Sequence, residues 1–465
     1  MDSSKTHQRI AASFRDPSGF LFQHQGVLYR QVNQSYQTDY DRLISSGLVQ
    51  TLIEKRRLIA HQEVEDVPAP LPAIGYKIIR PERVPFISYP YEWSFSQLKD
   101  AALLTLKIQK VALKAGMSLK DASAYNVQFH QGAPIFIDTL SFETYVEGRP
   151  WVAYRQFCQH FLAPLALMAT TDIRLNHLLQ NDIDGIPLDL ASRLLPWQTR
   201  LNFGLATHIH MHASAQKKYS DEAVHDHARK PAFSRAAMTG LIDNLTSTVK
   251  KLTWQPAGTE WGAYYSDTNY SDDAFEEKKR IVRQLIGRVQ PVRVLDLGAN
   301  TGVFSRIAAE DSRCLVLSTD IDPAAVELNY LAGKKTQCAN ILPLRLDLTN
   351  PWPAIGWNNQ EREAFLQRGK ADLVMALALV HHLAISNNVP LADIAGMLSE
   401  LSRFLIIEFV PKEDSQVQRL LASREDIFPT YTLEHFVAVF SQRFTLREQV
   451  QIPGTLRTLF LFEKA

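Results

Sequence analysis

Two kinds of hydrophobic pattern alternate along the second half of the chain. Short runs that are apolar at nearly every position stand at residues 294–297, 315–319, 342–346, 371–378 and 405–410. Between the first two runs, Phe304, Ile307 and Ala308 recur at a spacing of three and four residues. Continuous apolar runs are typical of parallel strands covered on both faces, and the wider spacing is typical of helices. The pattern predicts an α/β fold with a doubly wound sheet from about residue 276 to the C-terminus.

Aspartates follow these runs at a regular interval. Asp296, Asp320, Asp347 and Asp372 are separated by 24, 27 and 25 residues. This interval is about the length of one strand–helix repeat in a doubly wound sheet. A carboxylate at the end of such a strand can accept hydrogen bonds from both hydroxyls of a ribose, and Asp320 is the candidate for that role. The alternative for each acid is a helix N-cap or a solvated loop end, and for Asp322, which precedes Pro323, we expect the cap.

A glycine turn follows the first strand. Gly298 and Gly302 bracket a place where a ligand can approach the backbone without a Cβ in the way. A helix beginning there directs its unpaired N–H groups toward that ligand. A dinucleotide fingerprint needs a third glycine where Asn300 stands, which argues against NAD and FAD, and no Lys-Ser or Lys-Thr pair follows as in a P-loop. Taken alone, the motif is also compatible with an ordinary turn of another α/β domain.

Together these motifs resemble class I S-adenosylmethionine (SAM) dependent methyltransferases over residues 276–465. The resemblance implies a Rossmann-like, seven-stranded sheet closed by an antiparallel pair at 440–450 and 456–463, with SAM as the cofactor. It implies that the glycine turn holds the methionine end of SAM, with Asp296 beneath it, and that Asp320 and Asp347 hold the ribose and the adenine amine. The expected cofactor-binding residues are Asp296, Gly298, Asn300, Gly302, Asp320, Ile321, Asp347, Leu348, Ala376 and Tyr270.

Two adjacent histidines follow the fourth strand, where the resemblance implies that the chain faces the transferred methyl group. His381 or His382 could take a proton from an acceptor oxygen or nitrogen, because imidazole titrates near neutral pH. The alternative is that they only shape the pocket, since methyl transfer depends largely on alignment. Metal binding is not predicted, because no further Cys/His set has ligand spacing.

An aromatic segment precedes the sheet. Residues 251–275 contain Trp254, Trp261, Tyr264, Tyr265 and Tyr270. Aromatic side chains with a polar group prefer half-buried positions. We expect this linker either to fold over SAM and its acceptor, with Tyr265 and Tyr270 as the contacting residues, or to pack between two domains.

The first 250 residues carry a different motif. Asp121 is followed after four residues by Asn126 and, twelve residues later, by Asp138. This spacing resembles the catalytic loop and the metal-binding aspartate of protein-kinase-like folds, in which the first Asp orients a hydroxyl and the other two residues hold Mg²⁺. The context agrees: a hairpin at 19–32, a hinge strand at 84–90 and a long helix at 94–115.

The departures from the kinase pattern indicate a degenerate site. There is no His-Arg-Asp triplet, no glycine after Asp138 and no glycine-rich phosphate loop. Arg30 and Lys77 are the nearest candidates for the strand cation. We therefore expect an α+β, kinase-like N-terminal domain with a possible nucleotide site at Asp121, Asn126 and Asp138 that recognises a substrate or partner. The alternative is that Asp121 and Asn126 are turn residues.

Length and composition limit the remaining possibilities. A chain of 465 residues predicts two or three domains, here 1–250, a linker at 251–275, and 276–465. A net charge of +1 gives no reason to expect nucleic acid as a partner. The three cysteines, the lack of an apolar signal core and the lack of an 18-residue apolar run favour a cytoplasmic protein without membrane segments. The oligomeric state stays open.

The whole-chain arrangement, with the segment 406–414, resembles nodulation-protein-like methyltransferases. This resemblance implies a small-molecule or glycan acceptor in some relatives. The main hypothesis is a SAM-dependent methyltransferase acting on an O or N atom of an unidentified small molecule, glycan or protein. The alternatives are a non-catalytic protein that binds SAM or a nucleotide, and a bifunctional kinase-like methyltransferase.

Overall fold

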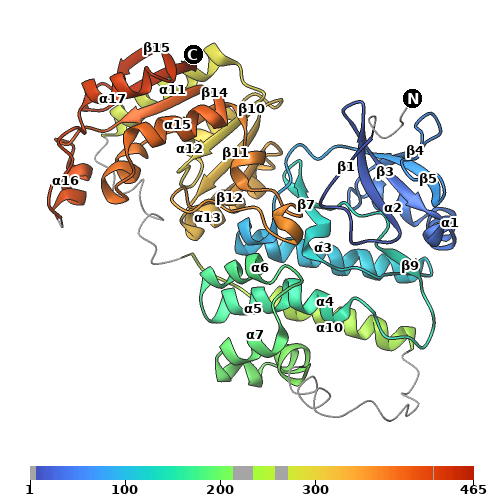
Figure 1. The fold of residues 1–465 in the computed structure, drawn as a ribbon. Coiled ribbons are helices and arrows are strands. Elements are labelled where there is room, and N and C mark those ends of the chain that lie inside the picture. Colours follow the sequence, from blue (N-terminus) through green and yellow to red (C-terminus); the bar gives the residue numbers. More distant parts are fainter. Residues whose placement is uncertain (1–6, 213–233, 257–270, 423) are drawn as a thin grey trace. The chain divides into compact units, whose positions relative to one another are not determined.

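The computed structural model describes residues 7–212, 234–256, 271–422 and 424–465 (Figure 1). The chain forms two compact units, each described by itself below. Unit 1 comprises Met1–Gln255 and Ala354–Arg362, and unit 2 comprises Pro256–Pro353 and Glu363–Ala465. The boundary after Gln255 falls inside the expected linker. The expected range 276–465 for a single C-terminal domain is wrong in one respect, because Ala354–Arg362 belongs to unit 1.

Unit 2 is built on a seven-stranded sheet with the order β12-β11-β10-β13-β14-β16-β15. The first five strands are parallel and the last two pairings are antiparallel. The strands are β10 (Arg293–Leu297), β11 (Leu315–Asp320), β12 (Ile341–Arg345), β13 (Ala371–Ala376), β14 (Ser402–Phe409), β15 (Phe444–Gln451) and β16 (Thr458–Lys464). The predicted doubly wound sheet with a closing antiparallel pair is therefore confirmed.

Helices cover both faces of this sheet because its strands are apolar at consecutive positions. Leu459 and Leu461 of β16 belong to the core that includes Ile281 and Leu285 of α11, whereas Phe460 and Phe462 contact Phe436. Successive side chains of a strand point to opposite faces. The helices are α11 (Asp272–Val289), α12 (Val303–Ala308), α13 (Pro323–Thr336), α14 (Phe365–Arg368), α15 (Leu391–Leu401), α16 (Ser415–Leu421) and α17 (Leu433–Phe440), with the π-helix η10 (His382–Ser386).

Unit 1 begins with a five-stranded antiparallel sheet of order β1-β2-β3-β5-β4 (Figure 1). Its strands are β1 (His7–Arg9), β2 (Gly19–His24), β3 (Val27–Asn33), β4 (His61–Val64) and β5 (Gly75–Pro81), with α1 (Gln37–Ser45) and α2 (Leu48–Glu54) between β3 and β4 in the chain. The predicted first hairpin is confirmed and turns at Gln25 and Gly26. The predicted hinge strand at 84–90 is wrong: no strand forms there, and Pro85 and Pro90 lack the N–H group that strand pairing needs.

The predicted long helix is α3 (Phe95–Lys114), and Ser94 caps it by accepting a hydrogen bond from Gln97 N. Two short hairpin-like pairs follow, β6 (Met117–Leu119) with β9 (Phe142–Thr144) and β7 (Val127–His130) with β8 (Ala133–Phe136). The described elements that follow along unit 1 up to Lys251 are helices and include α4 (Tyr154–Phe157), the π-helix η5 (Cys158–Leu162), α5 (Ala163–Thr170) and α10 (Arg235–Lys251). In the part of the chain that the structure describes, none of the helices has the length and apolar character needed to span a bilayer.

Candidate functional site

A cavity of about 420 Å³ lies in unit 2. This volume is within the range typical of small-molecule sites. Its walls come from residues at or just beyond the carboxyl ends of β10, β11, β12 and β13, and from α11, η10 and α16. Ligands of open α/β sheets bind at this edge, so the cavity is where the strand order predicts a binding site.

The glycine turn forms one wall of the cavity. Gly298 and Gly302 have φ angles of 69° and 79°, in the left-handed region that a residue with a Cβ rarely adopts. Asn300, which stands where a dinucleotide fingerprint has glycine, also has a positive φ of 51°. Asparagine is one of the few other residues that tolerates this conformation. The turn therefore keeps its shape despite the missing glycine, and Gly298 and Asn300 line the cavity while Gly302 does not.

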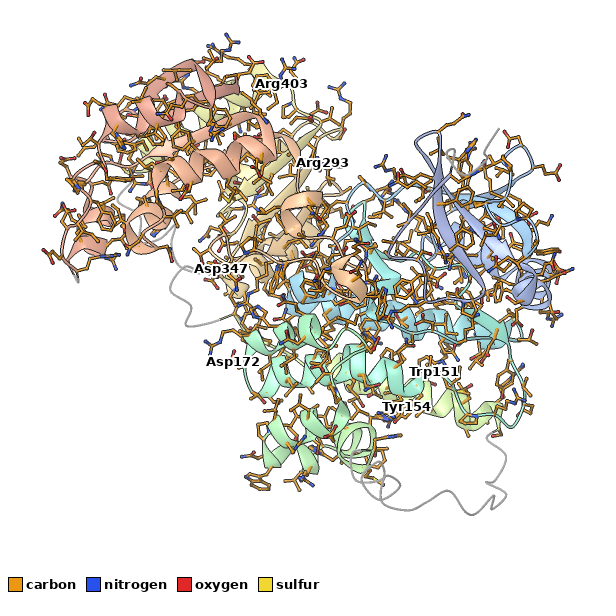
Figure 2. The ribbon with its side chains drawn as sticks, in the orientation of Figure 1. Trp151, Tyr154, Asp172, Arg293, Asp347 and Arg403 are labelled. Carbon is orange, nitrogen blue, oxygen red and sulfur yellow. The ribbon has the colours of Figure 1, made fainter. Side chains whose placement is uncertain are left out.

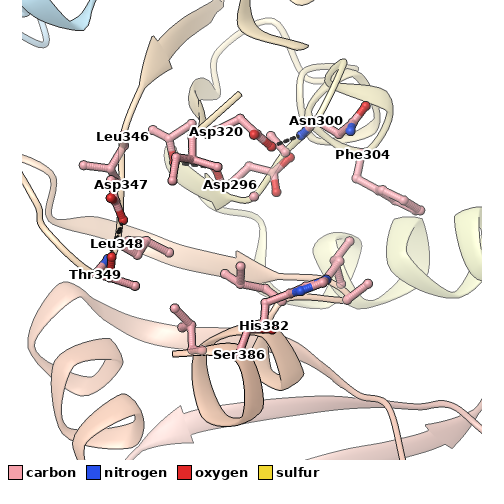
Figure 3. A pocket seen from close by; sticks show the side chains of 18 of the residues that line it. Asp296, Asn300, Phe304, Asp320, Leu346, Asp347, Leu348, Thr349, His382 and Ser386 are labelled. Carbon is pink, nitrogen blue, oxygen red and sulfur yellow. Dashed lines mark hydrogen bonds between the residues drawn. The ribbon is translucent and has the colours of Figure 1, made fainter. Parts of the chain in front are cut away.

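Asp320 is held rigidly beside that turn. Its two carboxylate oxygens accept hydrogen bonds from Asn300 N at 2.7 Å (Figure 3) and from Asp322 N at 2.9 Å. Burial raises the pKa of Asp320 to about 6, and the bonds from the backbone act in the opposite direction. A carboxylate has about four lone-pair sites, so Asp320 keeps acceptor capacity for a ligand. Asp322 caps α13 by accepting a bond from Ala324 N, as predicted.

Asp296 lies deeper in the same wall. It is buried, and Ser305 Oγ donates a hydrogen bond to its Oδ2 at 2.6 Å. Burial, with a smaller contribution from the charge of Asp320, raises the pKa of Asp296 to about 7, against the opposing effects of Ser305 and Lys278. A carboxyl group of this kind changes charge near neutral pH, which makes its protonation sensitive to a cationic ligand.

Asp347 and its neighbours form the opposite end of the cavity. Oδ1 of Asp347 accepts bonds from Thr349 N at 2.8 Å and Thr349 Oγ1 at 2.7 Å (Figure 3). These bonds lie within the loop after β12, in keeping with the loop-end alternative for this acid, but Asp347 also lines the cavity together with Leu348 and Ile321.

The two histidines differ in position. His382 lines the cavity, on the side opposite Asp296 and Asp320 in Figure 3. Burial, aided by Arg457, lowers the pKa of His382 to about 4, so the ring is neutral near pH 7. His381 is 1% exposed and is not among the residues that line the cavity, and its ring contacts that of His382 at an interplanar angle of 40°, with centroids 4.1 Å apart. Of the two, only His382 is placed to meet a ligand.

Several residues that line the cavity escaped the sequence analysis. They include Phe275 and Lys278 of α11, Thr319, Ser386, Asn387 and Leu420. A signal existed for Lys278, because it shares the apolar face of α11 with Ala274, Ile281, Val282 and Leu285. A lysine on the core face of a helix is unusual unless its charge is paired. Of the expected residues, Ala376 is the last residue of β13 and does not itself line the cavity, whereas the next residue, Leu377, does. Tyr270 lies outside the described residues, as do Trp261, Tyr264 and Tyr265.

Unit 1 brings together the three residues of the kinase-like motif. Asn126 Nδ2 donates to Ser141 Oγ at 3.2 Å, and Ser141 Oγ donates to Asp138 Oδ2 at 2.6 Å. Burial raises the pKa of Asp121, and the charge of Asp138 adds to the shift. Arg30 on β3 forms an ion pair with Asp138. Of the two cation candidates, Arg30 reaches the motif, whereas Lys77 pairs with Glu63.

Two histidines of unit 1, His208 and His210, bond to neighbouring side chains. His208 Nδ1 is 2.7 Å from the hydroxyl of Tyr154 (labelled in Figure 2), and its Nε2 is 2.7 Å from Asn244 Oδ1. His210 bonds to Ser192 and Thr199. Among the described residues no group of three or more His, Cys, Asp or Glu side chains is arranged to hold a metal ion.

Comparison with known proteins gives one long match. The nodulation protein NoeA of Rhizobium meliloti (strain 1021) is 35% identical over 463 residues, which cover 98% of this chain and 96% of the relative. No protein-family model matches the chain.

Solved structures match less than half of the chain. The N-methyltransferase NodS of Bradyrhizobium japonicum WM9, bound to S-adenosylhomocysteine (SAH), is 14% identical over 44% of this chain and 93% of its own, with a TM-score of 0.31. Magnesium protoporphyrin IX methyltransferase of Synechocystis PCC 6803 with SAH shows 18% identity, the same two coverages and the same score. The bifunctional kinase-methyltransferase WbdD is 13% identical over 43% of this chain and 42% of its own, with a TM-score of 0.30. At such scores the interpretation of the site depends on the site's own geometry.

Proposed function

The chain belongs to the family of the nodulation protein NoeA, and from this premise we propose that it is a SAM-dependent methyltransferase. In this proposal unit 2 binds SAM in the cavity at the carboxyl edge of the seven-stranded sheet. The acceptor is an oxygen or nitrogen atom of a small molecule, glycan or protein. The class of reaction is methyl transfer, and SAM supplies the electrophilic methyl group on its sulfonium.

One observation carries the proposal: three carboxylates line a single cavity beside a glycine turn. Asp320 presents two buried oxygens of a kind that accept ribose hydroxyls, and Asp347 stands near the other end to accept the adenine amine. Asp296 lies under the turn, where an ammonium group would be neutralised. The same set of donors and acceptors suits SAM better than a dinucleotide, whose pyrophosphate would meet three acids.

Other residues that line the cavity exclude water and accept a proton. The leucines Leu377, Leu379 and Leu383 and the ring of Phe304 line the cavity and limit the access of water. His382 is neutral near pH 7 and lies at the cavity, so its ring can accept the proton that an acceptor hydroxyl or amine loses. With a pKa of about 4 it is a weak base, and positioning of the acceptor therefore contributes more than proton transfer does.

Calorimetric titration with SAM tests the cofactor. We expect wild type to bind SAM and Asp320→Ala to bind it about 10- to 100-fold more weakly, because two hydrogen bonds to a charged acceptor are lost. Asp393→Ala removes an exposed acid from the first turn of α15 and serves as the matched control, with unchanged affinity. Absence of SAM binding in wild type, or equal binding by Asp320→Ala, would contradict the assignment. Release of SAH with a supplied acceptor separates an enzyme from a protein that only binds SAM.

A second candidate function is favoured by one observation in unit 1. The sheet order β1-β2-β3-β5-β4, with helices between β3 and β4, places the β3 cation Arg30 against Asp138, and Asp138 is linked through Ser141 to Asn126. We propose that unit 1 is kinase-like and binds a nucleotide. Arg30 already forms an ion pair with Asp138, the residue that corresponds to the metal-binding aspartate of kinases. This pairing supports nucleotide binding over phosphotransfer.

Thermal unfolding with and without Mg·ATP tests this second proposal. We expect Mg·ATP at about 100 times its Kd to stabilise the wild type by about 2.7 kcal/mol, because the ligand binds only the folded state. Asp138→Asn keeps the side-chain shape and should reduce the shift. An unchanged unfolding temperature at millimolar Mg·ATP would count against nucleotide binding while leaving the SAM site untouched.

A further inference from the structure

The charges that line the cavity are unequal in number. Among the described lining residues, Asp296, Asp320 and Asp347 are acids and Lys278 alone is a lysine or arginine. SAM carries one carboxylate, on its methionine moiety, and its other charges are positive. Lys278 is therefore the lining residue whose charge is complementary to the carboxylate of SAM, while the three acids complement its positive charges.

Lys278 is positioned from the core side of α11. Its side chain is 4% exposed, and its Nζ lies 2.6 Å from Glu408 Oε2 and 4.9 Å from the centre of the Phe304 ring. Burial lowers the pKa of Lys278, and Glu408 opposes this shift. Apolar residues of similar volume are often as stable as a buried ion pair, or more so. Packing alone therefore does not account for a lysine at this position.

A second cation stands behind the pair. Arg457 Nη1 is 3.6 Å from Glu408 Oε1, and its Nε and Nη2 bond to Asp414 at 2.7 and 3.1 Å. Lys278, Arg457 and Glu408 are buried and Asp414 is partly buried, so two cations and two carboxylates form one cluster with no net charge. When Lys278 also engages another carboxylate, Glu408 keeps Arg457 as a partner, so the new contact leaves no buried charge without compensation.

Lys278 and Asp296 are close enough that each shifts the pKa of the other. Both residues line the cavity, so together they present a positive and a negative group to a ligand there. An α-amino acid presents the complementary pair, a carboxylate and an ammonium. Neither Asp320 nor Asp347 has such a partner among the residues that line the cavity.

We propose that Lys278 recognises the carboxylate of the methionine moiety of SAM, with Glu408 and Arg457 positioning its ammonium group; this rests on the proposed function. Lys278 acts as a specificity determinant that separates SAM from cations of similar shape that lack the carboxylate. It is a binding residue and takes no part in the transfer of the methyl group.

The test compares SAM with decarboxylated SAM, which keeps the adenosine, sulfonium and amine but lacks the carboxylate. We measure the Kd of both ligands for wild type, Lys278→Met and Lys279→Met by calorimetry. We expect the ratio of the two Kd values, decarboxylated SAM over SAM, to fall about 10-fold or more in Lys278→Met, since a hydrogen bond between charged groups is lost. Lys279→Met removes the neighbouring half-buried lysine, which pairs with Glu276 and does not line the cavity, and should keep the wild-type ratio.

The double variant Lys278→Met/Glu408→Gln removes both charges of the pair and guards against misfolding caused by the loss of the Lys278 charge beside Glu408. We expect it to show the same loss of discrimination as Lys278→Met. A wild-type protein that binds both ligands equally, or folded variants that keep the wild-type ratio, would overturn the role of Lys278 and leave the SAM site in place. A wild-type protein that binds neither ligand would overturn the proposed function and this role with it.

Discussion

Individual carboxyl groups give the cavity its chemical character. Asp296 and Asp320 are buried next to each other, and burial raises their pKa values to about 7 and about 6. Both groups therefore change protonation within the range in which proteins are usually assayed. A cationic ligand that needs the ionised forms must displace protons when it binds.

SAM binding should therefore depend on pH. As pH rises from about 5 to 8, we expect the Kd for SAM to fall and proton release on binding to decline, because the carboxyls become ionised before the ligand arrives. Calorimetry in buffers of different ionisation enthalpy measures both quantities. Asp296→Asn should remove the part of the dependence centred near pH 7, and a Kd that is constant over this range in wild type would contradict the prediction.

Rising pH has the opposite effect on the stability of the unligated protein, because it lowers the free energy of unfolding. A carboxyl whose pKa is raised on folding keeps its proton in the folded state after the unfolded chain has lost it. For Asp296 this window runs from the ordinary value of 3.8 to about 7, and the free energy of unfolding declines with rising pH across it. The same acid thus opposes folding and favours SAM as pH increases.

At the scale of elements, α12 depends on the conformation of its first turn. Gly302 is the N-cap of this helix, with a φ of 79°, and a Cβ added there would lie 2.2 Å from Asn329 Oδ1. Asn329 in turn donates to Ser318, which shares a hydrogen bond with the Ser305 that holds Asp296. The glycine is therefore required by the close approach of α13 as well as by the turn.

Gly302→Ala should destabilise the protein by about 2 kcal/mol or more, because the left-handed conformation alone costs about 1–2 kcal/mol and the clash adds to it. The midpoint of urea unfolding measures this change. Gly333→Ala in α13 is the matched control, since nothing lies within 4 Å of the added Cβ. It should be neutral or stabilising by up to about 1 kcal/mol, as is usual inside helices. Equal effects of the two variants would contradict the structural role of Gly302.

The elements of unit 2 were predictable because their cause is local. Strands buried on both faces must be apolar at every position, so β10, β11, β13 and β14 stand out along the chain. The segment 84–90 in unit 1 was predicted as a strand because it is also short and apolar. Its prolines and the capped turn after Tyr89 prevent strand pairing. Periodicity by itself does not distinguish such a segment from an edge strand.

At the scale of the whole molecule, one short segment of unit 1 is inserted into the sequence of unit 2. Ala354–Arg362 lies between β12 and β13 in sequence and belongs to unit 1. There Glu361, with a side chain 1% exposed, accepts two hydrogen bonds from Arg15 at 2.6 and 3.0 Å, and Arg362 lies 4.3 Å from the ring centre of Tyr125. Tyr125 precedes Asn126 of the kinase-like motif. No local pattern in these nine residues indicates which unit they join.

Sequence alone determined the parts whose physics is local: the strands, the glycine turn, the spacing of Asp296, Asp320 and Asp347, and the cap at Asp322. Each follows from burial, backbone conformation or hydrogen bonding between near neighbours. Only the tertiary structure decided that His382 lies at the cavity and His381 does not, that Arg30 pairs with Asp138, and that Lys278 joins the three acids. These depend on side chains from distant segments that meet, and on the burial that shifts their charges, which no spacing along the chain encodes.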